Sequence, residues 1–572
     1  MTTSMTSVEM WNIYKKWLKD PSQDFINTCF SNYIQMPYFM SISPQIKRTD
    51  KIDDGKPDMI NNYKNDVNLI MQFYVDKNYA RQNEIKKCLF FNVNNKLINK
   101  IYLFNEREYT KKELGIDSEK IIQIVTGKRL TYESIFNLIE QHSINGYIVI
   151  ANSDIFFDSS LDNIKTCDFT EKNVLALCRH EYKGSGPLIN CRLFEEGRPD
   201  SQDAWIFHSD INVPREKRNI FNFPMGKSGC DNKLIYLFQI LGYQCYNEAT
   251  LIKIYHYHNV QTRNYNTKDK VPSPYCALFP ITSSEDKLNL SHSFNIIIEN
   301  QQFCNYINRK IKENKPFIIP RIAGVENEMA YHGAILMQSG NVFPQKYFEK
   351  PFQIMKNNAG IKLSNNRSIV KYSKSYLSAF EMCDAYFDWE PWSGLAKSIF
   401  KSLNFIFNNF KKQRFWSLTL DVFDHITTKP WTQELTGKRI LIVSPFVESF
   451  KDKINIRDKI YGIELFPNCE FIFLKPPQTQ ANCYSEEFDI ELNRFVEKIR
   501  EIKDDFDISL LSCGGYGNLV CSEIYKMGKS AIYVGGVLQM YFGVYGNRWE
   551  RERPEIISLY KNEYWSRPKE EE

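Results

Sequence analysis

An Asn-Ser-Asp triplet follows directly after a short apolar segment of the chain. Residues 147–151 (YIVIA) predict a buried strand, and Asn152, Ser153 and Asp154 come next. Ligands of open α/β sheets bind beyond the carboxyl ends of the strands, so these side chains are expected to face a crevice. Asp154 could there bind Mg²⁺ or Mn²⁺, which would also take diphosphate oxygens. The alternative is a plain turn, which Asn, Ser and Asp favour.

Two further carboxylates stand in patterns that suit acid–base chemistry. Residues 201–207 (SQDAWIF) put Asp203 beside a large aromatic, and the glycine-bearing loop 223–232 (FPMGKSGCDN) ends with Asp231 at a predicted helix start. A carboxylate projecting into the crevice could accept a proton from an attacking hydroxyl. Asp231 could instead be an N-terminal helix residue favoured by the helix dipole.

Two of the eight histidines lie two residues apart. The segment 250–258 (TLIKIYHYH) predicts a strand, whose period of two places His256 and His258 on one face. Imidazole is a competent ligand for Mn²⁺-class ions, so either could complete a metal shell. They could also be polar residues on a half-exposed strand.

A second candidate site lies in the C-terminal half. The strand predicted at 508–512 is followed by Gly514, Gly515 and Gly517 and then by a helix. Glycines at such a junction let the backbone approach a phosphate, and the helix N-terminus favours an anion. The spacing is not the dinucleotide-binding fingerprint, and glycine turns also simply join strands to helices.

Upstream of that loop, the segment 319–326 (IPRIAGVE) ends a predicted strand with a basic and an acidic residue. Arg321 could meet a phosphate. Glu326 could meet a metal or a sugar hydroxyl.

Short apolar strands alternate with helical segments in both halves, which is typical of an α/β layer fold with a mostly parallel sheet. The strands predicted in the first half are 67–75, 100–104, 120–125, 147–151, 174–178 and 250–257, with helices at 78–92 and 132–141. Those predicted in the second half are 439–444, 469–474, 508–512 and 530–534, with helices at 392–410 and 491–503.

The chain of 572 residues is too long for one core, so two domains are expected. We expect an N-terminal arm or cap at 1–60, an α/β domain at 61–275, a linker at 276–315 and a second α/β domain at 316–572. Hydrophobic residues at 43% and charged residues at 25% exclude a fibrous or wholly disordered chain.

Composition also limits the partners. The formal charge of +5 is spread thinly, so nucleic-acid binding is not indicated. No apolar run approaches the roughly 18 residues needed to span a bilayer, and the first residues show no secretory signal. These features predict a soluble cytoplasmic protein of bacterial or viral origin, in the host cytoplasm if viral. The 14 cysteines include no CxxC pair, so no zinc ribbon is expected.

The order YIVIANSDIFFD, SQDAWIF, FPMGKSGCDNKLIYLFQILGYQCYN and IKIYHYHNVQTRNY resembles glycosyltransferases of the GT-A fold, over roughly residues 66–265. The resemblance implies that Asp154 is the last acid of a DxD-type motif holding Mn²⁺ or Mg²⁺ and the diphosphate of a nucleotide sugar. It further implies that Asp231 is catalytic and that His256 or His258 is a late metal ligand. Asn152 departs from the motif, which has an acid there.

Residues from about 316 to 549 resemble the GT-D type of glycosyltransferase domain, with IPRIAGVE at the position of its Asp-Gly-Glu segment and with RILIVSPF, LLSCGGYG and YVGG in matching order. Gly324 stands where an Asp is expected, which leaves Glu326 as the acid of that segment.

Taken together, the two resemblances imply two Rossmann-like α/β domains and a bifunctional glycosyltransferase. It would move sugars from nucleotide-sugar donors to a glycan or other hydroxyl acceptor. The expected catalytic residues are Asp203, Asp231 and Glu326, and the expected donor-binding residues are Asn152, Asp154, Arg321, Gly514, Gly515 and Gly517. Two alternatives remain, a non-catalytic C-terminal module that binds nucleotide or acceptor, and a structural protein built on degenerate transferase folds.

Overall fold

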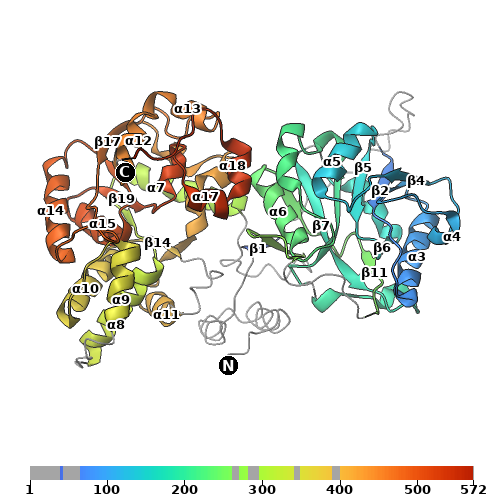
Figure 1. Cartoon of the computed structure of the whole chain (residues 1–572), viewed down its shortest axis with the longest axis horizontal. Helices are drawn as coiled ribbons and strands as arrows, with labels where there is room; N and C mark the ends of the chain where they lie inside the picture. The colour runs from blue at the N-terminus through green and yellow to red at the C-terminus, as the bar shows by residue number, and fades with distance from the viewer. Residues whose placement is uncertain are drawn as a thin grey trace. The chain divides into compact units, whose positions relative to one another are not determined.

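The computed structural model describes residues 39–42, 65–169, 171–196, 198–260, 269–280, 296–339, 348–388 and 400–570 (Figure 1). The chain divides into two compact units, an N-terminal unit within residues 37–295 and a C-terminal unit that includes residues 296–572. Each unit contains a sheet with parallel strands and flanking helices, which confirms the α/β class.

The segments expected as an arm and a linker contain regular structure where they are described. Of residues 1–60, strand β1 (Phe39–Ile42) is described, and it pairs in parallel with β12 (Cys276–Phe279). Helix α7 (Ile296–Glu313) lies in the C-terminal unit. The helix expected at 392–410 lies partly outside the described residues, and its described part is α11 (Phe400–Asn409).

The N-terminal unit is built on a ten-stranded sheet, in which eight strands follow the order β4-β3-β2-β5-β9-β7-β11-β6 and β8 and β10 pair with β7. Its strands are β2 (Val67–Met71), β3 (Lys100–Asn105), β4 (Ile121–Val125), β5 (Tyr147–Ala151), β6 (Ile155–Phe157), β7 (Asn173–Glu181), β8 (Arg192–Leu193), β9 (Gln202–His208), β10 (Gln244–Tyr246) and β11 (Ile254–His256). Every side chain of β2 and β5 is buried, as expected for parallel strands covered on both faces.

The order of the parallel strands reverses at β2. The chain runs outward from β2 to β3 and β4, then returns so that β5 pairs with the other side of β2. In open α/β sheets, ligands commonly bind at such a topological switch point, beyond the carboxyl ends of the strands. Helix α3 (Tyr79–Asn94) begins there, because the Asn78 side chain accepts hydrogen bonds from the backbone N–H groups of Ala80 and Arg81.

The other half of this sheet differs from the mostly parallel arrangement that the sequence predicts. Strand β9, in the segment SQDAWIF, runs antiparallel between β5 and β7. The pairing of β9 with β7 shifts between Leu177↔Ala204 and Cys178↔Gln202, so Asp203 occupies a β-bulge. A bulge bends its strand and redirects the side chain of the extra residue. The strand predicted at 250–257 is confined to β11.

The C-terminal unit contains a five-stranded, fully parallel sheet in the order β13-β19-β18-β16-β17. Its strands are β13 (Ile318–Ile319), β16 (Arg439–Val443), β17 (Glu470–Leu474), β18 (Ile508–Leu511) and β19 (Ser530–Tyr533). The helices that pack their apolar faces into its core include α8 (Gly324–Ser339), α10 (Asn366–Met382), α14 (Phe488–Glu501) and α15 (Gly517–Lys526). The order of the strands reverses between β16 and β18, just before the glycine-bearing loop.

No described helix combines the length and hydropathy that crossing a membrane requires.

Candidate functional site

A buried ion pair spans the switch point of the N-terminal unit. Arg81 comes from the first turn of α3, and Asp154 follows β5 by three residues. The Arg81 Nη2 atom lies 2.5 Å from Asp154 Oδ2, and its Nη1 atom lies 3.0 Å from Glu84 Oε2. Glu84 is held in turn by the backbone N–H of Asn259 at 2.8 Å. The helix after β2 therefore fixes the carboxylate that follows β5.

Both predicted histidines reach the same carboxylate oxygen. Strand β11 pairs antiparallel with β6, and the register places His256 opposite Ile155, next to Asp154. Asp154 Oδ2 lies 3.3 Å from His256 Nε2 and 3.5 Å from His258 Nδ1. We call Asp154, His256 and His258 the Asp154 centre. Among the described residues, it is the group of carboxylate, imidazole and thiol side chains whose ligand atoms converge as a metal site requires.

The spacing of the Asp154 centre fits a divalent ion. Two ligand atoms that share an ion at about 2.1 Å lie roughly 3.0–3.5 Å apart, depending on the coordination angle. The separations of 3.3 and 3.5 Å from the Asp154 oxygen to the two imidazole nitrogens fall in that interval. One oxygen and two nitrogens would leave further coordination positions for a ligand.

The network continues from the Asp154 centre to the end of β5. His256 Nδ1 lies 3.3 Å from Glu181 Oε1, which accepts a 2.8 Å hydrogen bond from Arg179 Nε. Arg179 Nη1 donates to Asp203 Oδ2 at 2.7 Å, and Asn152 Nδ2 donates to Asp203 Oδ1 at 2.8 Å. The structure thus brings Asn152, Asp203 and the Asp154 centre into one hydrogen-bonded system.

The network has more carboxylates than guanidinium groups. Its charged members, apart from the imidazoles, are Arg81, Glu84, Asp154, Arg179, Glu181 and Asp203. The surplus of two negative charges would be neutralised by one divalent cation beside neutral imidazoles. In the absence of a metal, protonated imidazole would supply positive charge.

The pKa values follow from this arrangement. Burial alone would raise the pKa of Asp154, but His256, His258 and Arg81 together hold it well below its usual range. Burial would lower the pKa of His256, yet Asp154 and Glu181 raise it to about 9. The pKa of Glu181 falls to about 2, because His256 and Arg179 outweigh its burial. A metal at the Asp154 centre would therefore have to displace the proton on His256.

Four members of the network were not predicted from the sequence: Arg81, Glu84, Arg179 and Glu181. The predicted strand 174–178 ended too early, because β7 continues through Arg179 and Glu181. The sequence does contain a signal, because Arg179 and Glu181 follow the apolar run VLALC much as Asp154 follows YIVIA. Arg81 and Glu84 gave no such signal, because charged residues in the first turns of a helix are common.

Asp231 is not one of the hydrogen-bonded residues of the network, but the charge of Asp203 affects its pKa. It lies in the first turn of α6 (Cys230–Ile240), where it is partly buried. Burial, together with the negative charges of Asp203 and Asp200, raises its pKa to about 8. The carboxyl group is therefore largely protonated at neutral pH and ionises above pH 8.

The residues predicted in the C-terminal unit also lie near one another. The backbone N–H of Arg321 donates to Asn518 Oδ1 at 3.0 Å, directly beside Gly517, and its Nη1 atom donates to the carbonyl oxygen of Val534 at 3.0 Å. Glu326 is buried in the first turn of α8. Burial raises the pKa of Glu326, and the charge of Arg321 offsets this only in part.

The glycines of the C-terminal loop pack against the protein's own atoms. A Cβ atom at Gly517 would lie 2.4 Å from the ring of Tyr533, and one at Gly515 would lie 2.4 Å from Ile361 Cγ1. The Tyr533 hydroxyl donates to the carbonyl oxygen of Gly514 at 2.8 Å. Close packing accounts for glycine at these positions, and phosphate binding by the loop stays a prediction.

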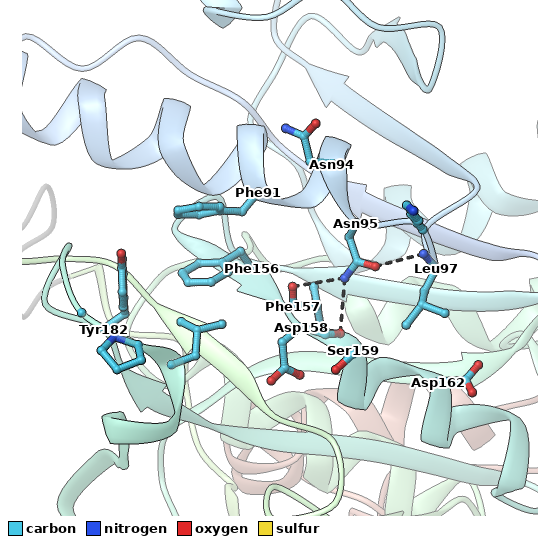
Figure 2. A pocket seen from close by; sticks show the side chains of 14 residues that line it. Phe91, Asn94, Asn95, Leu97, Phe156, Phe157, Asp158, Ser159, Asp162 and Tyr182 are labelled. Atoms are coloured by element: carbon cyan, nitrogen blue, oxygen red, sulfur yellow. Dashed lines mark hydrogen bonds between the residues drawn. The ribbon is translucent and has the colours of Figure 1, made fainter.

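A surface pocket of about 780 Å³ lies at the C-terminal end of β6 (Figure 2). Asp154 precedes the other end of this strand and does not line the pocket. Aromatic side chains including Phe91, Phe156 and Tyr182 line one side. On the other side, the Asn95 amide donates to the carbonyl oxygens of Phe157 and Asp158, and its oxygen accepts from the backbone N–H of Leu97. These bonds hold α3 to β6, so Asn95 serves to join the two elements.

Fold and site together define an α/β protein with a carboxylate–imidazole cluster at a topological switch point. No family model and no curated protein matches the chain.

Solved structures similar to this chain include two of the domain of unknown function 1792, one of them described as having a distinct glycosyltransferase fold. Both show 12% identity and cover 47% of this chain and 88% of theirs, with TM-scores of 0.27 and 0.24. The glycosyltransferase GlyE of Streptococcus pneumoniae TIGR4 also shows 12% identity, covering 61% of this chain and 90% of its own, with a TM-score of 0.21. Scores this low do not establish a shared fold, so the α/β class rests on the strand order.

The packing of Gly517 leads to a stability prediction. Its backbone is helical, so Gly517→Ala introduces no backbone strain and only the contact with Tyr533. We expect Gly517→Ala to lower the free energy of unfolding by about 1–3 kcal/mol in urea denaturation followed by circular dichroism. Gly546→Ala is the control, because no atom lies within 4 Å of the added methyl group. Equal stability of the two variants would contradict the packing explanation.

Proposed function

We propose that the N-terminal unit is a metal-assisted glycosyltransferase that uses a nucleotide-sugar donor and a glycan or other hydroxyl acceptor. The observation that carries this proposal is the convergence of Asp154, His256 and His258 at the switch point, where α/β sheets bind their ligands. The order of the motifs along the chain, which resembles that of GT-A glycosyltransferases, supports the same assignment.

In this proposal each group has a defined role. Mn²⁺ suits the mixed oxygen and nitrogen ligands of the Asp154 centre better than Mg²⁺, which prefers oxygen. When bound, the ion would stabilise negative charge on the departing diphosphate. Asp231 is proposed as the general base, which removes the proton of the acceptor hydroxyl in its ionised form. Asp203 raises the pKa of Asp231 and anchors Asn152.

For the C-terminal unit, we favour a nucleotide- or acceptor-binding module over a second transferase. Its acidic candidate, Glu326, is buried with a raised pKa, and Ile361 and Tyr533 pack closely against Gly515 and Gly517 of its glycine loop. Arg321 and the N-terminus of α15 remain candidates for binding an anion. Bifunctionality and a cytoplasmic location stay predictions of the sequence.

Asp154→Asn tests the metal role. The amide is a weaker ligand for a cation, so we expect Mn²⁺-dependent hydrolysis of a nucleotide-sugar panel to fall about 100-fold or more. Asp162→Asn is a matched control, because this partly exposed carboxylate of the same unit pairs with Lys165 away from the network. Unchanged Mn²⁺-dependent turnover in Asp154→Asn would refute the assignment.

The raised pKa of Asp231 predicts a pH dependence. Only the ionised carboxylate is a base, so transfer should increase as pH rises through about 8. Asp200→Asn removes one negative charge near Asp231 and should move this rise to lower pH. Above pH 8, where the wild-type carboxylate is ionised, Asp231→Asn should reduce transfer by about 100-fold or more. A profile of kcat/KM against pH that is the same in Asp200→Asn and wild type would contradict the electrostatic origin.

Glu326→Gln separates the two readings of the C-terminal unit. A binding module predicts that Glu326→Gln leaves hydrolysis of the nucleotide-sugar panel unchanged. Activity that survives in Asp154→Asn but disappears in the double variant Asp154→Asn/Glu326→Gln would instead reveal a second transferase site.

A further inference from the structure

Arg179 occupies the middle of the network and joins two carboxylates that lie on different strands. Its side chain is 15% exposed, and its guanidinium carbon lies 4.0 Å from the centre of the Phe194 ring. The Nε atom donates to Glu181, and Nη1 donates to Asp203 and, at 2.5 Å, to Ser201 Oγ. No prediction from the sequence assigns this residue a role.

The backbone explains why one side chain can serve both carboxylates. Arg179 and Glu181 are two residues apart on β7, so they share a face of the sheet. The parallel register with β11 places Glu181 beside His256 on that face. On the other side of β7, the bulge in β9 places Asp203 within reach of the same guanidinium group.

We propose that Arg179 is the positioning residue of the Asp154 centre, acting on His256 through Glu181 and on Asn152 through Asp203. The part of this inference that concerns a metal rests on the proposed function. The part that concerns the orientation of His256 rests on the described contacts alone. The hydrogen bonds of Arg179 go to Glu181, Asp203 and Ser201 and not to the proposed metal ligands, so its role is indirect.

The guanidinium group suits this role for geometric reasons. It is planar and presents its N–H donors in a fixed fork, so it can hold two carboxylates at a set angle. A lysine at this position has one flexible ammonium group and the same charge. Arg179→Lys would therefore keep the charge balance but lose the fixed orientation of Glu181 relative to Asp203.

The orientation of Glu181 matters because it determines which nitrogen of His256 faces Asp154. A carboxylate on one ring nitrogen directs the other nitrogen toward a metal and makes it a stronger ligand. Substitution of such outer residues typically weakens metal affinity by about 10–100-fold. We expect a loss in this range from Arg179→Lys and from Glu181→Gln.

The first measurement is a titration of the full-length protein with Mn²⁺ alone, with free Mn²⁺ followed by electron paramagnetic resonance. Arg179→Lys should raise the Kd for Mn²⁺ by about 10–100-fold. Arg218→Lys is the matched control, because Arg218 is also buried in this unit but bonds to Glu140 and to the carbonyl oxygen of Val213. If Arg179→Lys acts through Glu181, adding Glu181→Gln should weaken binding little further.

The second measurement works without any metal. In ¹⁵N-histidine spectra, the His256 signals, assigned with a His256→Gln variant, should shift in Arg179→Lys and in Glu181→Gln and stay in place in Arg218→Lys. If wild type takes up no Mn²⁺, the metal site fails, and these spectra alone decide the positioning role. A lower Tm in Arg179→Lys with unchanged His256 signals would make the residue merely structural and overturn the inference.

Discussion

The charge of the buried Asp154 carboxylate must be compensated, because an unpaired charge inside a protein costs several kcal/mol. Arg81 supplies part of this compensation from the helix after β2, and the imidazoles of His256 and His258 supply the rest from the strand β11 region. Compensation therefore requires three segments that are far apart in sequence to meet at one oxygen atom. The topology of the sheet makes this possible, because β2 and β5 are neighbours and β11 pairs with β6 directly after Asp154.

The sequence predicted the α/β class and several strands of both units, because parallel strands read as short runs of Val, Ile and Leu. Most ends of the predicted strands lie within a few residues of the strand ends in the structure. Strand β9 was not predicted, because SQDAWIF contains a charged residue and was interpreted as a site motif. The structure shows a buried strand, in which Asp203 occupies the bulge. Local pattern alone does not reveal a bulge, which depends on pairing with β7.

The candidate site was predictable where residues follow a strand end and less so where they act through others. Asn152, Asp154 and the two histidines stand in local patterns from which they were predicted as site residues. Glu181 becomes meaningful only through the register of β7 with β11, which a sequence does not contain. The glycine loop of the C-terminal unit shows that one sequence pattern can have two explanations. Its spacing suited phosphate binding, yet Tyr533 and Ile361 fill the space that a side chain at Gly517 or Gly515 would need.

The bulge in β9 also limits how this protein can change. Deletion of Asp203 would restore regular pairing between β9 and β7, with an uninterrupted ladder of backbone hydrogen bonds. The same deletion would remove the carboxylate that Arg179 and Asn152 share. A regular ladder of hydrogen bonds between β9 and β7 is therefore incompatible with the carboxylate shared by Arg179 and Asn152, so the irregular strand is a requirement of this network.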